Sequence, residues 1–127
     1  MNLLLDTHVL LWCLAAPHRL RRETRKKIEA PETVVFVSAA SAWEIEVKRA
    51  LGKLKVPADL EQQLQDKRFT ELPVRVRHVR ELRTLPELHR DPFDRMLVAQ
   101  ARYEGLTILT ADEHLSRYGV PTIDARK

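Results

Sequence analysis

The sequence predicts an α/β fold of three layers, with helices on both faces of a mainly parallel central sheet of about five strands. Strand-like apolar runs alternate along the chain with longer segments in which apolar residues recur at helical spacing. Because parallel strands need crossover connections, strands separated by helices indicate a parallel sheet covered on both faces. The length of 127 residues is that of one ordinary domain, so we expect a single domain over residues 1–127.

The expected strands are short and apolar. The first reads NLLLD, the second TVVFVS and the fourth LTILT, whereas the third, FTELPV, is weaker. We therefore expect strands at residues 2–6, 33–38, 69–74, 106–110 and 120–123.

The segments between these strands have helical patterns. We expect helices at 7–16, 20–29, 40–51, 58–67, 75–85 and 92–104, with a short helix near 113–117. Asp91 followed by Pro92 is typical of a helix N-cap and first helical residue. In the helix at 75–85, the apolar residues at helical spacing are expected to face the core; they are Val76, Val79, Leu82 and Leu85.

The charge balance favours a polyanionic partner without proving one. The chain has 22 Lys and Arg against 18 Asp and Glu, a formal charge of +4. Basic residues gather in RLRRETRKK (19–27) and RVRHVRELR (75–83). Both segments fit amphipathic helices with a solvated polar face, and nucleic-acid contact is the alternative.

The N-terminal apolar stretch is not expected to be a signal peptide, because no Lys or Arg precedes it and Asp6 and His8 interrupt it. No stretch approaches the roughly 20 apolar residues of a membrane span. Cys13 has no second cysteine with which to form an intrachain disulfide, and its neighbours Trp12 and Leu14 favour a buried thiol. We expect a cytoplasmic protein with no membrane contact.

Several acidic residues follow the expected strands, where the carboxyl ends of parallel strands meet and ligands bind. Asp6 ends the first strand and Asp112 follows the fourth. Ser38 ends the second, and Glu44 comes about one turn into the next helix. Asp91 and Asp94 begin the helix at 92–104. Three or four carboxylates are therefore expected at one edge of the sheet.

Each acid also has a purely structural interpretation. Asp6, Asp91 and Asp112 could be helix N-caps. Asp94 could simply favour the positive end of a helix dipole, and Glu44 could pair with Lys48 one turn along.

Taken together, uncompensated carboxylates in one cleft repel each other, and a divalent cation resolves this repulsion. Oxygen ligands suit Mg²⁺ or Mn²⁺, whereas zinc would require closely spaced Cys and His. A carboxylate-held metal in a basic protein suggests phosphodiester hydrolysis. This reasoning does not choose between Asp91 and Asp94 as ligands.

Four segments, in order, resemble the signatures of a known family: LLLDTHVLLW, SAASAWEIEVK, DPFDRMLVAQA and LTILTADEHL. They are similar to the motifs of PIN-domain ribonucleases, specifically the VapC-type toxins of type II toxin–antitoxin pairs. The resemblance extends from residue 2 to about residue 124. It implies a PIN-like fold.

The resemblance also implies roles for individual residues. Asp6, Glu44 and Asp94 match the three acids that hold Mg²⁺ or Mn²⁺, and Asp112 matches a fourth, more variable acid. Thr7, Ser38 and Thr110 match supporting hydroxyl or small polar positions. The pattern favours Asp94 over Asp91, which is left either to reach the metal through water or only to cap its helix.

The implied activity is endonucleolytic cleavage of RNA to a 5′-phosphate and a 3′-hydroxyl. Arg95 could contact a phosphate or pair with nearby acids. The implied partners are a second copy, in a homodimer, and a cognate antitoxin that silences the site. An antitoxin could dock on the apolar residues Trp12, Trp43, Leu51 and Leu54, although core packing explains these residues as well.

Two other functions are compatible with parts of the pattern. A catalytically silent PIN fold could serve as a binding or scaffold module. A phosphoryl-accepting signalling domain also gathers acids at this edge, but it would need an adjacent acidic pair after the first strand, where this chain has only Asp6.

Overall fold

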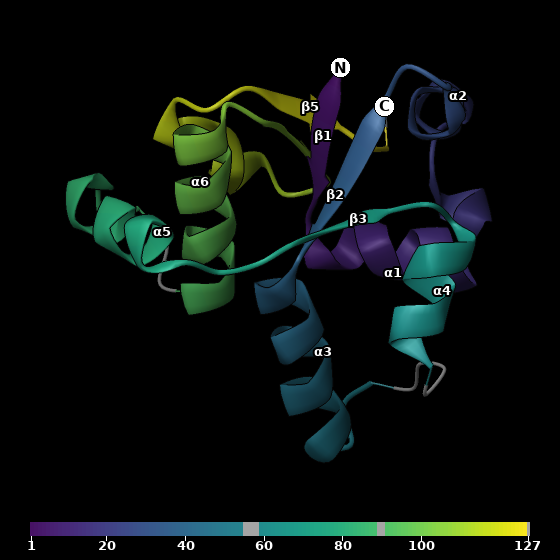
Figure 1. The fold of residues 1–127 in the computed structure, drawn as a ribbon, viewed down its shortest axis with the longest axis horizontal. Coiled ribbons are helices and arrows are strands. Elements are labelled where there is room, and N and C mark those ends of the chain that lie inside the picture. The colour runs from purple at the N-terminus through teal and green to yellow at the C-terminus, as the bar shows by residue number, and fades with distance from the viewer. Residues whose placement is uncertain (55–58, 89–90, 127) are drawn as a thin grey trace.

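The computed structural model describes residues 1–54, 59–88 and 91–126, and it confirms the predicted three-layer α/β fold (Figure 1). The sheet has the strand order β3-β2-β1-β4-β5, and every neighbouring pair is parallel. The strands are β1 (Asn2–Leu5), β2 (Val34–Ser38), β3 (Thr70–Leu72), β4 (Thr107–Thr110) and β5 (Thr122–Asp124).

Helices cover both faces of the sheet. In Figure 1, α5 (Val76–Glu81) and α6 (Pro92–Glu104) lie to the left of the strands. On the right lie α1 (Thr7–Ala15), α2 (Arg22–Glu29) and α4 (Leu60–Asp66), whereas α3 (Ala39–Ala50) extends downward from the end of β2. Short 3₁₀ helices complete the connections: η1 (Pro17–Arg19), η2 (Leu82–Thr84) and η3 (Glu113–Tyr118).

The central strand β1 is buried on both faces because its side chains alternate between two cores. Leu4 packs with residues of α6, whereas Leu3 and Leu5 pack with Val9 and Leu10 of α1. A strand sandwiched in this way must be apolar at every position. This requirement explains the run of three leucines before Asp6.

One expectation about the core is only half right. Leu82 and Leu85 pack in the core as expected, whereas the two valines do not. Val76 and Val79 of α5 are 77% and 48% exposed, and the buried residue of that helix is His78. The His78 ring turns inward because Nδ1 accepts from the Arg75 N–H at 3.0 Å and Nε2 lies 3.4 Å from Glu104 Oε1. The helix also ends at Glu81 and tightens into η2, so an ideal helix over 75–85 gives the wrong face for the two valines.

Other boundaries differ by a few residues. The expected helix at 20–29 begins at Arg22, after η1, and the expected strand at 120–123 lies at 122–124. The expected helix at 58–67 is α4, with residue 58 outside the described residues. Cys13 is buried as predicted. Within the described residues, no helix is long and apolar enough to span a membrane.

Candidate active site

Asp6 lies at the carboxyl end of β1, buried between the sheet and α1. It is 4% exposed and caps α1, since its Oδ1 accepts from the Val9 N–H at 2.8 Å. Its other oxygen accepts a short hydrogen bond from the Thr110 hydroxyl at the end of β4. Burial raises the pKa of Asp6, and these two hydrogen bonds only partly oppose the rise. The Asp112 carboxylate raises it further.

Glu44 is buried one turn into α3, and both of its carboxylate oxygens have partners. The Thr7 hydroxyl donates to Oε1 at 2.6 Å and also lies 3.1 Å from the Ser41 hydroxyl. The Lys48 ammonium lies 2.6 Å from Oε2. Because Thr7 directly follows Asp6, this contact ties the beginning of α1 to α3 beside the buried Asp6.

Asp91 and Asp94 lie at the amino end of α6. Asp91 caps this helix, with Oδ1 accepting from the N–H groups of Phe93 at 2.8 Å and Asp94 at 3.2 Å. The hydrogen bond to Glu44 is the main cause of a raised pKa of Lys48, and the charges of Glu44, Asp91 and Asp94 add to it. Lys48 is therefore a common electrostatic neighbour of three acids.

Asp112 follows β4 and is more open to solvent, with its side chain 37% exposed. Its backbone N–H donates to the Thr110 hydroxyl at 2.9 Å, so Thr110 links Asp112 to Asp6. Its Oδ1 accepts from the His114 N–H at 2.9 Å and lies 3.0 Å from His114 Nδ1. Asp112 is thus both the cap of η3 and a neighbour of Asp6.

Ser38 is fully buried, but its hydrogen bonds are structural. Its oxygen accepts from the Ala40 N–H at 3.0 Å and caps α3, and its hydroxyl donates to Gln100 Oε1 at 2.5 Å. Gln100 Nε2 donates in turn to the Pro73 carbonyl at 3.2 Å. These contacts join α6 to the ends of β2 and β3.

Sequence reasoning missed Ser41 and Gln100. Ser41 lies three residues before Glu44, a spacing that places both on one helix face. Gln100 is the one polar residue in the run MLVAQA, and a polar side chain in a buried stretch requires partners. The sequence indicates Lys48 only as a partner of Glu44, whereas the charges of Asp91 and Asp94 also act on it.

The predicted residues thus form two linked groups. Asp6, Thr110 and Asp112 form one, and the second joins Thr7 and Glu44 through Lys48 to Asp91 and Asp94. The structural interpretations hold as well, since Asp6, Asp91 and Asp112 are all helix caps. In the described part of the chain, no three His, Cys, Asp or Glu side chains form a ready-made metal-binding group.

The chemistry of the donors nevertheless fits Mg²⁺ or Mn²⁺. The groups on hand are carboxylates and hydroxyls, which are ligands for hard cations. The pKa of Asp6 is raised by burial, which means that its ionised form lacks sufficient compensation in the protein alone. A divalent cation would supply that compensation.

Arg95 turns away from these acids. Its Nη1 donates to the Pro86 carbonyl at 2.9 Å and its Nη2 to the Leu82 carbonyl at 3.4 Å. The guanidinium therefore braces the connection between η2 and α6.

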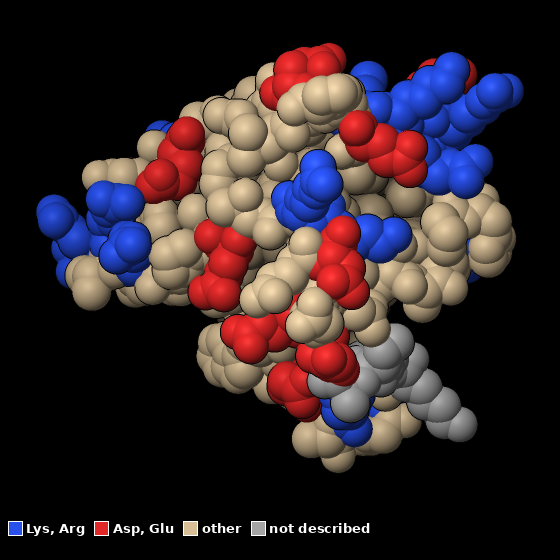
Figure 2. Space-filling model, turned by 45° about the vertical axis from the view of Figure 1, so that its right-hand side comes forward, with Lys and Arg blue, Asp and Glu red and all other residues tan. Residues whose placement is uncertain are grey.

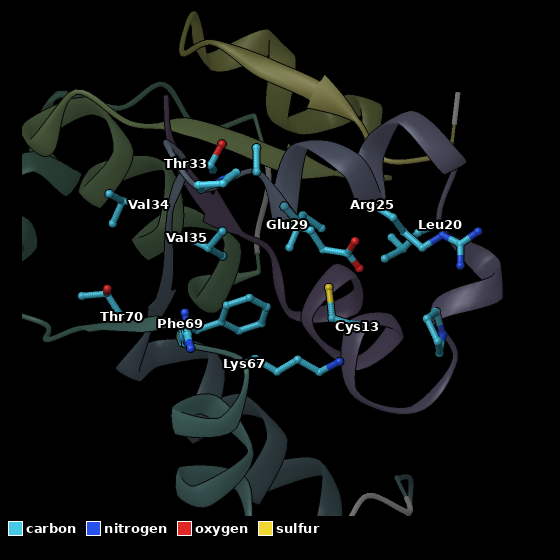
Figure 3. A pocket seen from close by; sticks show the side chains of 15 residues that line it. Cys13, Leu20, Arg25, Glu29, Thr33, Val34, Val35, Lys67, Phe69 and Thr70 are labelled. Carbon is cyan, nitrogen blue, oxygen red and sulfur yellow. The ribbon is translucent and has the colours of Figure 1, made fainter.

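A cavity of about 500 Å³ lies apart from the acids, between α1, α2 and the beginnings of β2 and β3. Figure 3 shows Cys13, Glu29 and Lys67 reaching toward it from different elements. Burial raises the pKa of the Cys13 thiol to about 11, so this thiol is protonated and unreactive at neutral pH. The lining of this cavity contains none of the predicted site residues.

Comparisons with known proteins agree with this architecture. Residues 3–121 match the model of the PIN domain. The fold is similar to the crystal structure of VapBC2 from Rickettsia felis bound to a DNA fragment from their promoter, with a TM-score of 0.70 and 14% identity over 97% of this chain and 98% of that chain. It is also similar to FitAcB from Neisseria gonorrhoeae, with a TM-score of 0.65 and 19% identity over 97% of each chain. No curated protein matches the sequence significantly.

Proposed function

Because the chain belongs to the PIN domain family, we propose that it is a Mg²⁺- or Mn²⁺-dependent endoribonuclease, the toxin of a type II toxin–antitoxin pair. The observation that supports this proposal is that the acids are linked in two groups: Asp6 with Asp112 through Thr110, and Glu44 with Asp91 and Asp94 through the charge of Lys48. Two of these acids, Asp6 and Glu44, are almost completely buried. RNA phosphodiesters are the proposed substrate, in keeping with the net positive charge of the chain.

The proposed metal ligands are Asp6, Glu44, Asp94 and Asp112. When bound, the metal would activate water and neutralise charge that develops on the phosphate. Thr110 and Thr7 orient the carboxylates of Asp6 and Glu44 by hydrogen bonds. Asp91 fixes the first turn of α6, on which Asp94 lies, through its two accepted N–H bonds.

Lys48 affects how a metal would bind at this site. It already neutralises Glu44 and interacts electrostatically with Asp91 and Asp94, so a metal at Glu44 Oε2 must displace its ammonium. The Lys48 side chain is 36% exposed, so its ammonium can move into solvent and be hydrated there. The Lys48 ammonium is therefore a cation that a bound metal could replace at Glu44.

The proposed protein partner is an antitoxin that docks a helix on α3. Trp43 and Leu51 are 64% and 63% exposed, with Val47 on the same stripe between them. Trp12 and Leu54, which were considered with them, pack instead against the buried cluster beneath α1. We further propose that the protein forms a homodimer. We also propose that it acts on RNA in the cytoplasm.

The test is cleavage of total RNA and of transfer RNA by the purified protein in Mg²⁺, Mn²⁺ or EDTA. Asp94→Asn should abolish cleavage, since it removes a charged ligand without changing volume. Asp66→Asn is the matched control, because Asp66 is an exposed residue of α4 whose contact is with Gln62. It should cleave as the wild type does.

The outcomes separate the candidate functions. Metal-dependent bands that are lost in Asp94→Asn alone support the nuclease. Equal cleavage by wild type and Asp94→Asn would refute the ligand assignment. Absence of both cleavage and Mn²⁺ binding in calorimetry would favour the silent scaffold.

A further inference from the structure

The outer surface of α5 and η2 is strongly basic and hollowed. Arg77, Arg80 and Arg83 line a hollow of about 350 Å³ together with Tyr103 of α6, and Glu81 and Thr84 complete its lining. Residues 75–84 contain four arginines and one acid. Figure 2 shows Lys and Arg gathered at the left end of the molecule, over α5, and again at the upper right, around α2.

Tyr103 is held in place at this hollow while its side chain stays accessible. The Arg77 guanidinium carbon lies 5.1 Å from the centre of the Tyr103 ring, and Arg77 Nη2 is anchored to Glu104 Oε1 at 3.3 Å. The buried His78 ring meets the same tyrosine edge to face at 5.7 Å. Tyr103 is nevertheless 47% exposed. A fixed, accessible aromatic ring is a surface on which a nucleobase can stack.

Arg80 and Arg83 supply positive charge to this hollow. Among the described residues, neither forms an ion pair, whereas Arg77 and Arg102 pair with Glu104 and Glu81. The two arginines are three residues apart and lie on one helical surface. Planar guanidinium groups bind phosphate through two parallel hydrogen bonds, so the pair suits a polyanion.

The segment that forms most of the hollow, α5 and η2, runs alongside α6 toward the end of α6 at which Asp94 lies. Arg77 contacts Glu104 at the end of α6, whereas the carbonyl of Leu82, next to Arg83, accepts from Arg95 near its beginning. Nine residues, or two and a half turns, separate Asp94 from Tyr103, so the two side chains are about 14 Å apart along the axis and on opposite sides of α6. A single strand of RNA with a phosphate at the acids would therefore have to pass around α6 to reach this hollow.

We propose that the hollow binds a nucleotide of the RNA substrate, with the base on Tyr103 and the flanking phosphates on Arg80 and Arg83. This inference rests on the proposed nuclease function and extends it to a surface outside the acids. The exposed Val76 and Val79 on the same helix make a protein partner the competing occupant. The backbone phosphates of single-stranded RNA explain two arginines that form no ion pair within the described part of the chain, which apolar contact does not.

The test is binding of a fluorescent single-stranded RNA to the full chain in EDTA. Fluorescence anisotropy measures the binding at a series of KCl concentrations. The double variant Arg80→Gln, Arg83→Gln should weaken binding at least tenfold and reduce the slope of log K against log salt by about 1.4, that is 0.7 for each lost phosphate contact. Tyr103→Leu should weaken binding at least about fivefold with the slope unchanged, because stacking carries no charge.

The matched control is Arg22→Gln, Lys26→Gln, which removes the same charge from exposed positions of α2. Equal weakening in the two double variants would overturn the proposal, since net charge alone would then explain binding. Unchanged RNA binding in Arg80→Gln, Arg83→Gln would also overturn it, even where the wild type cleaves RNA and the nuclease stands. Loss of binding in that variant, in a protein that cleaves no RNA, would support the hollow and refute the nuclease.

Discussion

The ion pair between Lys48 and Glu44 offers a test of the metal site in which one substitution has two opposite effects. Lys48→Met removes the ammonium that lies 2.6 Å from Glu44 Oε2 and keeps a long apolar side chain. Glu44 retains its hydrogen bond from Thr7, but it loses its counter-ion in a position where its side chain is only 4% exposed. The metal-free protein should therefore become less stable, while the metal should bind more tightly.

The size of both effects follows from the exposure of the two partners. Exposed ion pairs contribute about 0–1 kcal/mol, and removal of one partner from a buried pair costs about 3–5 kcal/mol. Because Lys48 is 36% exposed and Glu44 is buried, we expect a loss of about 1–2 kcal/mol in the free energy of unfolding. A metal that displaces Lys48 is penalised by no more than this contact, so the Mn²⁺ affinity should rise about 5- to 30-fold in the variant.

Urea unfolding in EDTA measures the first effect, and calorimetric titration with Mn²⁺ measures the second. Lys53→Met is the control, because it removes the same charge from an exposed residue just beyond α3. Unchanged stability in EDTA together with unchanged or weaker Mn²⁺ binding would refute the reasoning, since Lys48 would then not compete for Glu44.

Two further predictions concern Asp6 and Cys13. Burial raises the pKa of Asp6 above its unfolded value, so ionisation of Asp6 subtracts stability from the metal-free fold as the pH rises above about 4. Asp6→Asn should therefore be more stable than the wild type in EDTA near neutral pH; identical urea midpoints across the acid-to-neutral range would contradict this. Burial raises the pKa of Cys13 to about 11, so at about pH 8 the native thiol should react about 100-fold more slowly than a thiol with the ordinary pKa of 9.0. Labelling at the rate of the urea-unfolded chain would show that this thiol is not protected.

The central strands could be predicted because burial on both faces leaves them no freedom of composition. β1, β2 and β4 are dense apolar runs, and their ends were expected to within one residue. The edge strand β5 is only half-buried, so its sequence carries a weaker signal and its position was off by two residues at its start. Leu82 and Leu85 face the core as expected, but Val76 and Val79 do not, because the hydrogen bonds of His78 turn its ring inward in their place.

The positions of the candidate site residues could be predicted because parallel strands fix where their ends meet. Their contacts could not, since these depend on how α3 and α6 approach each other. The electrostatic interaction of Lys48 with Asp91 and Asp94 is such a case, as is the hydrogen bond from Ser38 to Gln100 across 62 residues of sequence. Spacing within one helix reveals neither.

The capping role of Asp6 does not by itself explain why a carboxylate stands there. Asparagine caps a helix about as well as aspartate and cannot ionise, so for a cap alone the amide would avoid the cost of a buried charge. The raised pKa of Asp6 is the sign of that cost, and the Asp112 carboxylate nearby increases it. A fold that served only as a scaffold would gain nothing from this arrangement. A cation held between Asp6 and Asp112 would turn the same repulsion into binding free energy, which favours the nuclease over the scaffold.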